Sequence, residues 1–204
     1  MFDRAAIKRK AKDAVTSQYG ISLGVYLLFA LITSAVTGAT AGFAALFIVP
    51  PLAVGYAYFC IRVYKGIAGD ISDMFNIGFA DYGRNLGGVL WMYLFTFLWS
   101  LLFIIPGIIK GISYSMTPYI LADCPKVRAT DALSLSMRMT KGHKGGIFVM
   151  YLSFIGWGVL SALTAGILWL VYAGPYMSTA FSGLYIVLKQ KAIESGAIRA
   201  EELL

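Results

Sequence analysis

Acidic residues, histidine and cysteine are scarce in this sequence, and their scarcity excludes several kinds of chemistry. The 204 residues include ten Asp and Glu, one His and two Cys. Cys60 and Cys124 have neither the number nor the spacing of a disulfide framework or a metal site, so we predict two reduced cysteines. His143 lies beside two lysines in "TKGHKGG", which is a poor setting for a metal ligand or a paired base. The sequence also has no phosphate-binding glycine loop and no nucleophile beside a base, so we expect no enzyme, no cofactor and no metal.

Charged residues are almost absent from several long stretches of the chain. The composition is 59% hydrophobic and 13% charged, against about 25% charged in soluble domains. One crossing of a bilayer needs about 20 apolar residues. We therefore predict six membrane-spanning segments, at 19–39, 42–63, 87–105, 107–123, 145–164 and 166–188. Residues 1–18 are too charged for the core of a signal peptide, and we expect them to be retained.

The basic residues lie between the predicted spans in a one-sided pattern. If the spans alternate from a cytoplasmic N-terminus, sixteen of the seventeen Lys and Arg residues and all ten acidic residues fall on the cytoplasmic side. An excess of Lys and Arg in cytoplasmic loops sets the orientation of membrane proteins, which predicts that both termini are cytoplasmic. The basic residues flank spans and form no folded basic face, so we expect no nucleic-acid partner. Membrane lipids are the expected partner, since basic residues attract the anionic leaflet.

The fold class predicted from these patterns is all-α: a polytopic membrane protein with six transmembrane helices. We expect an N-terminal amphipathic interfacial helix at 1–18, one transmembrane domain at 19–190 and a cytoplasmic tail at 191–204. Short cytoplasmic amphipathic helices are predicted at 71–80 and 128–140. These helices either pack on the membrane surface or dock a cytoplasmic partner. For docking, the candidate residues are Arg128, Asp131, Arg138 and Lys141.

The sequence contains signs of an internal repeat. "IVPPLAVGYAY" (48–58) and "IIPGIIKGISY" (104–114) share the spacing of a Pro, a Gly and a Tyr, and "MYLFTFLW" (92–99) resembles "MYLSFIGW" (150–157). The repeats predict three helical hairpins, at 19–64, 87–124 and 145–190, each with a proline in its returning helix. Prolines are tolerated there where neighbours satisfy the freed carbonyls, so we expect the returning helices to pack centrally. Repeats of this kind often build a site at their shared interface, although similar composition alone would give the same matches.

Glycine pairs spaced four apart predict close helix packing. Such spacing lets two helix backbones approach. The pairs are Gly20/Gly24, Gly38/Gly42 and Gly107/Gly111.

Lys110 is the one basic residue inside a predicted span. Ser113, Tyr114 and Thr117 follow it on the same helix, and together the four form a candidate ligand-binding site for an anionic group. The alternative is that the lysine stem carries its ammonium group to the outer interface. Asp123, at the cytoplasmic end of the same span, is expected to pair with Lys126 or Arg128 at the surface.

Three joined stretches resemble one family. "IIPGIIKGISYSMTPYILADCP", "ATDALSLSMRMTKGHK" and "LSFIGWGVLSALTAGILWLVYAGPY" are similar to the bacterial integral-membrane proteins grouped as domain of unknown function 975. The similarity is dense over 87–190 and thinner before it, where "DISDMFNIGFADYGRNL" is similar to the family's first cytoplasmic loop. The resemblance implies a multi-pass protein of the bacterial cytoplasmic membrane, and it brings no catalytic residues.

Two functions follow from these patterns. In the first, the protein is a membrane-embedded binding or transport component for a lipid or amphipathic molecule. The predicted spans contain no internal carboxylate for ion coupling, so energised transport would need a partner. In the second, it is an accessory or scaffold subunit that docks a membrane-protein partner through its cytoplasmic helices. The patterns leave the oligomeric state and the ligand open.

Overall fold

The computed structural model describes residues 2–203, which form helices joined by turns and short loops, with no strand in this range. Met1 and Leu204, the end residues of the predicted segments 1–18 and 191–204, lie outside the described residues. The elements follow in the order α1 (Arg4–Ser17), α2 (Tyr19–Ala39), α3 (Ala45–Tyr64), α4 (Ile71–Ala80), α5 (Tyr82–Leu102), α6 (Ile104–Tyr114), α7 (Thr117–Asp123), α8 (Ala129–Thr140), α9 (Lys144–Leu152), α10 (Ile155–Leu163), the π-helix η1 (Trp169–Ala173), α11 (Gly174–Glu194) and the 3-10 helix η2 (Ala200–Leu203).

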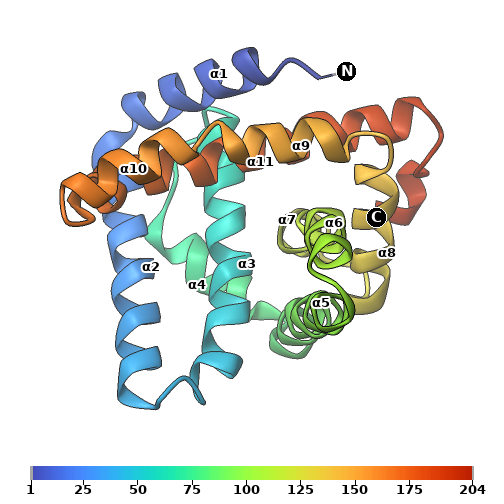
Figure 1. Cartoon of the computed structure of the whole chain (residues 1–204), viewed down its shortest axis with the longest axis horizontal. Coiled ribbons are helices and arrows are strands. Elements are labelled where there is room, and N and C mark those ends of the chain that lie inside the picture. The colour runs from blue at the N-terminus through green and yellow to red at the C-terminus, as the bar shows by residue number, and fades with distance from the viewer. Residues whose placement is uncertain (1, 204) are drawn as a thin grey trace.

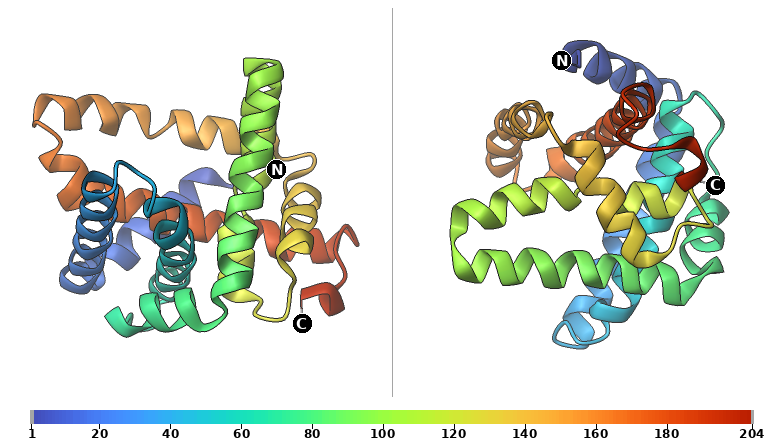
Figure 2. Two further views of the ribbon diagram at one scale, coloured as in Figure 1. Left: turned by 90° about the horizontal axis from the view of Figure 1, so that it is seen from below. Right: turned by 90° about the vertical axis from the view of Figure 1, so that its right-hand side faces the viewer.

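The chain turns back after α2, after α5 and after α10, and the helices on either side of these turns point in different directions (Figure 1). In Figure 1, α2 and α3 run down the page, α9, α10 and α11 run across it, and α5 and α6 are seen nearly end-on. The two views in Figure 2 agree, because α5 stands upright in one and the α5–α6 hairpin lies across the other. The hairpins therefore cross one another and do not form a bundle of parallel spans.

Within residues 2–203, four helical segments are long and apolar enough to cross a membrane. They are Tyr19–Ala39, Ala45–Tyr64, Tyr82–Leu102 and Lys144–Leu163. The chain is thus compatible with a membrane protein, while the predicted spans 107–123 and 166–188 are not among these segments. The first of the two is divided between α6 and α7, and the second is divided between η1 and α11.

The division between α6 and α7 has a local cause. Pro118 has no N–H to donate to the carbonyl of Tyr114, where α6 ends. A side chain of α8 joins the two pieces, because the Ser136 hydroxyl donates to the carbonyl of Ser113 at 2.7 Å and accepts from the backbone N–H of Met116 at 3.2 Å. The break is therefore a buried, hydrogen-bonded turn.

Prolines elsewhere are accommodated by tyrosines from other hairpins. Pro51 leaves the carbonyl of Phe47 without a helical donor, and the Tyr82 hydroxyl donates to this carbonyl at 3.2 Å. In the third hairpin, the Tyr19 hydroxyl donates at 3.1 Å to the carbonyl of Val171, four residues before a proline. Neighbouring helices thus satisfy these two freed carbonyls, as expected for returning helices that pack centrally.

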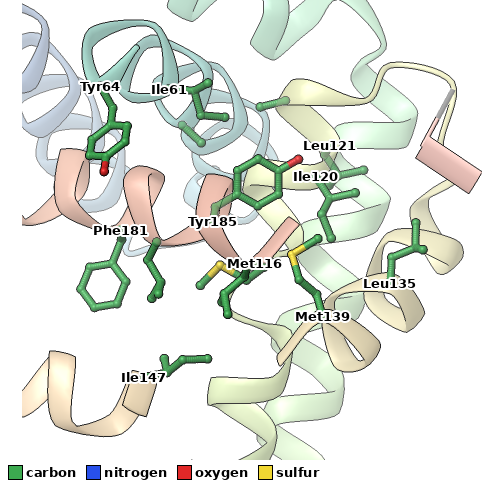
Figure 3. Close-up of a cluster of buried hydrophobic side chains, with 14 of the residues drawn as sticks. Ile61, Tyr64, Met116, Ile120, Leu121, Leu135, Met139, Ile147, Phe181 and Tyr185 are labelled. Atoms are coloured by element: carbon green, nitrogen blue, oxygen red, sulfur yellow. The ribbon is translucent and has the colours of Figure 1, made fainter. Parts of the chain in front are cut away.

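The core lies where the returning helices α3, α7 and α11 meet, and α1, α8 and α9 cover it. Figure 3 shows side chains from α3, α7, α8, α9 and α11 turned toward one another, with Tyr185 among them. Tyr185, Met116 and Ile120 are completely buried. The N-terminal helix α1 is confirmed as a helix, with Asp3 accepting from the N–H of Ala5 at 2.9 Å. Its Ile7 and Ala11 pack into this core, and its Ala14 and Val15 pack into a second cluster with α2 and α3.

Close packing at glycine occurs mainly at positions other than those predicted. A Cβ on Gly55 would overlap the carbonyl oxygen of Met74, and one on Gly78 would lie 2.6 Å from the carbonyl oxygen of Pro51, so α3 and α4 cross in contact. Of the predicted pairs, Gly107 lies tight against Ser100 of α5. The prediction is wrong for the other two pairs, because no neighbouring atom lies within 4 Å of the position that an added Cβ would take: Gly20/Gly24 and Gly38/Gly42.

Candidate functional site

The ends of the three returning helices meet at one carboxylate, Asp123. The Lys189 ammonium of α11 lies 2.5 Å from Asp123 Oδ2, and the Tyr185 hydroxyl donates to the same oxygen at 2.9 Å. Lys65, directly after α3, places its ammonium 3.6 Å from Asp123 Oδ1. Each hairpin therefore contributes to this group, which we call the Asp123 cluster: Lys65, Asp123, Tyr185 and Lys189.

Asp123 and Lys189 form a half-buried ion pair at the centre of the cluster. Burial alone would raise the pKa of Asp123, but the hydrogen bond from Lys189 and the charges of Lys189 and Lys65 outweigh it and lower the pKa. Burial would lower the pKa of Lys189, and the bond to Asp123 raises it instead. The prediction that Asp123 pairs with Lys126 or Arg128 is wrong, because the chain turns after α7 and Arg128 pairs with Asp131 of its own helix at 2.8 Å.

A thiol completes the surroundings of the cluster. Cys124 Sγ lies 3.5 Å from the Lys189 ammonium and 3.9 Å from the Tyr185 hydroxyl oxygen. Burial raises the pKa of the Cys124 thiol, so it is not an activated nucleophile. Both cysteines are free and buried, which confirms that they form no disulfide.

The cluster borders a pocket of about 330 Å³ in which opposite charges balance. Lys65 and Lys189 line it together with Asp123 and Glu194. With two charges of each sign, the pocket has no excess positive charge for an anion. Among residues 2–203, no group of three His, Cys, Asp or Glu side chains is placed to hold a metal ion. The geometry suits a set of ion pairs that holds helices together.

The predicted ligand site around Lys110 is only partly assembled. The Lys110 ammonium lies 4.8 Å from the ring centroid of Trp99 and 5.9 Å from that of Tyr114, so two aromatic faces stabilise the cation. Ser113 is buried and donates to the carbonyl of Ile109 at 2.7 Å. Thr117 is completely buried. Lys110 and Tyr114 are thus neighbours, while the other two side chains point into the protein.

The predicted docking residues all lie on or beside α8, and three of them are paired within the chain. Arg128 and Asp131 pair with each other. Arg138 contacts Glu202 at 2.7 Å and also donates to the carbonyl of Ala197 at 2.7 Å. Lys141 is exposed. The predicted cytoplasmic tail therefore folds back onto α8, where its residues Ile198 and Leu203 are buried.

The contact between Arg138 and Glu202 predicts a measurable change in the tail. The hydrogen bonds from Arg138 lower the pKa of Glu202 to about 2, so the pair is ionised at neutral pH. We expect Glu202→Gln to increase the rate of tryptic cleavage after Arg199 by about threefold, because an exposed pair of this kind contributes modestly to docking. Glu201→Gln removes the same charge from the adjacent residue and is the control. Equal cleavage of the two variants would contradict the docked tail.

A groove between hairpins carries hydroxyl groups within an apolar lining. It holds about 510 Å³, and its lining comes from α5, α6, α7 and α9 and the turn after α6. We call it the hydroxyl groove; its lining residues are Met92, Tyr93, Thr96, Phe97, Ser100, Gly111, Ser115, Pro118 and Tyr151. The sequence contains one signal of the groove that the prediction missed: Thr96 and Ser100 lie four apart on one helix face of an otherwise apolar segment.

Three hydroxyls of the groove have already used their hydrogens. Thr96 donates to the carbonyl of Met92 at 2.7 Å, Ser100 to that of Thr96 at 2.8 Å, and Ser115 to that of Ile112 at 2.8 Å. A hydroxyl that donates to its own helix keeps lone pairs that accept. The groove therefore offers acceptors to a ligand.

Comparisons with known proteins find one family. A family model described as "Protein of unknown function (DUF975)" matches residues 71–192, which is more than half of the chain. No curated protein and no solved structure matches. The matched range contains the Asp123 cluster except for Lys65, and the whole hydroxyl groove. The chain therefore belongs to the family described as "Protein of unknown function (DUF975)".

Proposed function

We propose that this protein is a non-enzymatic membrane protein that binds a lipid or amphipathic molecule in the hydroxyl groove. The observation that carries the proposal is the position of the groove between two segments apolar enough to cross a membrane, Tyr82–Leu102 and Lys144–Leu163. A groove of about 510 Å³ has the size of a small-molecule site. We place the protein in a cell membrane with both termini cytoplasmic, as its charge distribution predicts.

The groove favours a ligand with both an apolar chain and a hydrogen-bond donor. Tyr93 and Phe97 are 45% and 63% exposed and provide apolar surface for a hydrocarbon chain. Thr96, Ser100 and Ser115 provide acceptors, so a ligand hydroxyl or amine is expected to donate to them. A glycerol headgroup on acyl chains has this chemistry.

The alternative is an accessory subunit that docks a partner through α8. Of the four predicted docking residues, Lys141 is exposed without an ion pair in the described chain, whereas Arg138 is engaged by the tail. The arrangement favours the groove as the first function to test. Docking of a partner through α8 would require the C-terminal tail to leave Arg138.

The test compares two lipids whose headgroups differ in the number of hydrogen-bond donors. We expect native mass spectrometry of the detergent-purified protein to show more bound dioleoyl phosphatidylglycerol, which has two hydroxyls, than dioleoyl phosphatidylcholine, which has none. The double variant Thr96→Val/Ser100→Ala should lower phosphatidylglycerol binding by at least about fivefold, since each lost acceptor contributes about 0.5–1.5 kcal/mol.

A matched control exists on α2. Ser34 and Thr37 also donate to carbonyls of their own helix, at 3.0 and 2.7 Å, and do not line the groove. Ser34→Ala/Thr37→Val should therefore leave lipid binding unchanged. Equal binding of the two lipids, or equal loss in both double variants, would overturn the proposal.

A further inference from the structure

The α5–α6 turn is the most apolar exposed surface among the hairpin ends. Residues 101–105 read "LLFII", and their five side chains are between 63% and 78% exposed. From Asn85 to Ile109 the sequence has no charged residue. A turn that emerges into water normally carries polar residues, glycine or proline in its place. The composition of this turn is that of a surface in contact with hydrocarbon.

The length of α6 limits how far this hairpin reaches. α6 has 11 residues, which is about 16 Å of helix, whereas the hydrocarbon core is about 30 Å thick. After α6 the chain turns at Ser115 and Met116, and Ser136 of α8 holds this turn inside the protein. α6 alone therefore covers about half of a complete crossing, and α7 continues the returning limb inside the protein, where Leu121 packs against Gly88.

Only the second half of α5 extends beyond the protein core. The Arg84 guanidinium near the start of α5 donates to the carbonyl of Leu121 at 2.9 Å and to that of Cys124 at 3.2 Å, which fixes this end beside the Asp123 cluster. Gly88 lies close against Leu121 of α7. Farther along, Thr96 lies opposite Gly111, so α5 pairs with α6 from about this level to the turn. Figure 2 shows the paired limbs projecting away from the other helices.

We propose that the α5–α6 hairpin is re-entrant: it enters the bilayer from the face that carries Arg84, turns near the bilayer centre and returns to the same face. Lipid hydrocarbon is the partner that covers the exposed turn. The residues from Asn85 to Ile109 carry no charge and can therefore lie in hydrocarbon, whereas Arg84 marks the level of the membrane surface. Lys110 then lies within the leaflet that the hairpin enters, where the faces of Trp99 and Tyr114 hold its charge.

The experiment measures the depth of the turn. Phe103→Cys, in a background in which Cys60 and Cys124 are replaced by alanine, is labelled with an environment-sensitive fluorophore and reconstituted into phosphatidylcholine and phosphatidylglycerol vesicles. The vesicle lipids carry nitroxide quenchers either at the headgroup or near the chain end. We expect quenching from the chain end to be stronger by about twofold, because the turn lies near the bilayer centre. Unlabelled Phe103→Cys should also resist a membrane-impermeant maleimide added on either side.

Two further positions complete the test. Lys12→Cys on the exposed face of α1 should be reached by the impermeant maleimide from one side, which verifies the reagent. If Phe103→Cys fails to fold, Leu101→Cys replaces it. Only a variant that elutes from size-exclusion chromatography in detergent as a single species is used for the quenching measurement. Stronger quenching from the headgroup, or maleimide labelling of the turn from the side opposite Lys12, would overturn the re-entrant hairpin and show a complete crossing.

Discussion

Gly55→Ala is expected to lower the free energy of unfolding by about 3 kcal/mol. The added methyl group would overlap the carbonyl oxygen of Met74, a backbone atom that cannot rotate away. α3 and α4 would have to separate, and the packing around Met74, which is completely buried, would be lost. In a thermal-shift measurement in detergent, the midpoint should fall by about 10 °C.

Gly24→Ala is the matched control for this substitution. Gly24 also lies inside a helix of the transmembrane type, but no neighbouring atom lies within 4 Å of the position of an added Cβ. There the better helix propensity of alanine should stabilise the protein by up to about 1 kcal/mol. If both variants unfold at the same temperature, the α3–α4 crossing is not as close as described.

Asp123→Asn is expected to lower the free energy of unfolding by about 2 kcal/mol. Breaking a fully buried ion pair costs about 3–5 kcal/mol, and the Asp123 cluster is partly open, with side-chain exposures of 45% for Lys65 and 25% for Lys189. The control is Asp131→Asn, which breaks the exposed pair with Arg128 and should leave the free energy of unfolding nearly unchanged, because solvent screens an exposed pair. Chemical denaturation of the two variants beside the wild type measures both losses.

The effect of Asp123→Asn should depend on pH in a defined direction. The folded-state pKa of Asp123 lies below its ordinary value of 3.8, so its stabilising contribution is present above that value and is lost as the pH falls through the folded-state pKa. The pKa of Lys189 is raised above 10.5, so its contribution is present at lower pH and is lost only as the pH rises through the raised value. The difference in midpoint between wild type and Asp123→Asn should therefore be constant near neutral pH and shrink below about pH 4. A difference that stays constant into acid would contradict the assignment.

The helical class and the three hairpins could be predicted from the sequence, because apolar stretches separated by charged turns are a local signal. The central position of the returning helices could be predicted from their prolines. The donors that satisfy the carbonyls freed by these prolines could not be predicted. Tyr19 and Tyr82 satisfy carbonyls on other hairpins, and nothing in the local sequence distinguishes these tyrosines from interfacial ones.

The break inside the predicted span 107–123 could not be predicted from hydropathy alone. Residues 107–123 are apolar enough on average, but Pro118 and the hydrogen bonds of Ser136 divide them into two short helices. The deciding partner, on α8, lies about twenty residues away, and its role depends on tertiary packing.

For the glycines and for Asp123, too, the local sequence does not identify partners that are distant in the chain. Spacing within one helix indicates that a close approach is possible, while the approach observed joins Gly55 and Gly78 on two helices. The local sequence around Asp123 predicts a surface pairing with nearby residues, but its partners Lys65 and Lys189 come from the other two hairpins. The Asp123 cluster lies where the three hairpins meet, and its ion pairs join their ends.

We conclude that the Asp123 cluster holds the three returning helices together at their ends. A double-mutant cycle of Asp123→Asn and Lys189→Met, measured by chemical denaturation in detergent, tests it most directly. We expect a coupling energy of about 1.5 kcal/mol or more between the two positions, and a much smaller coupling for the exposed Arg128–Asp131 pair. If the two single losses add to within about 0.5 kcal/mol, the cluster does not join the helices and the claim is wrong.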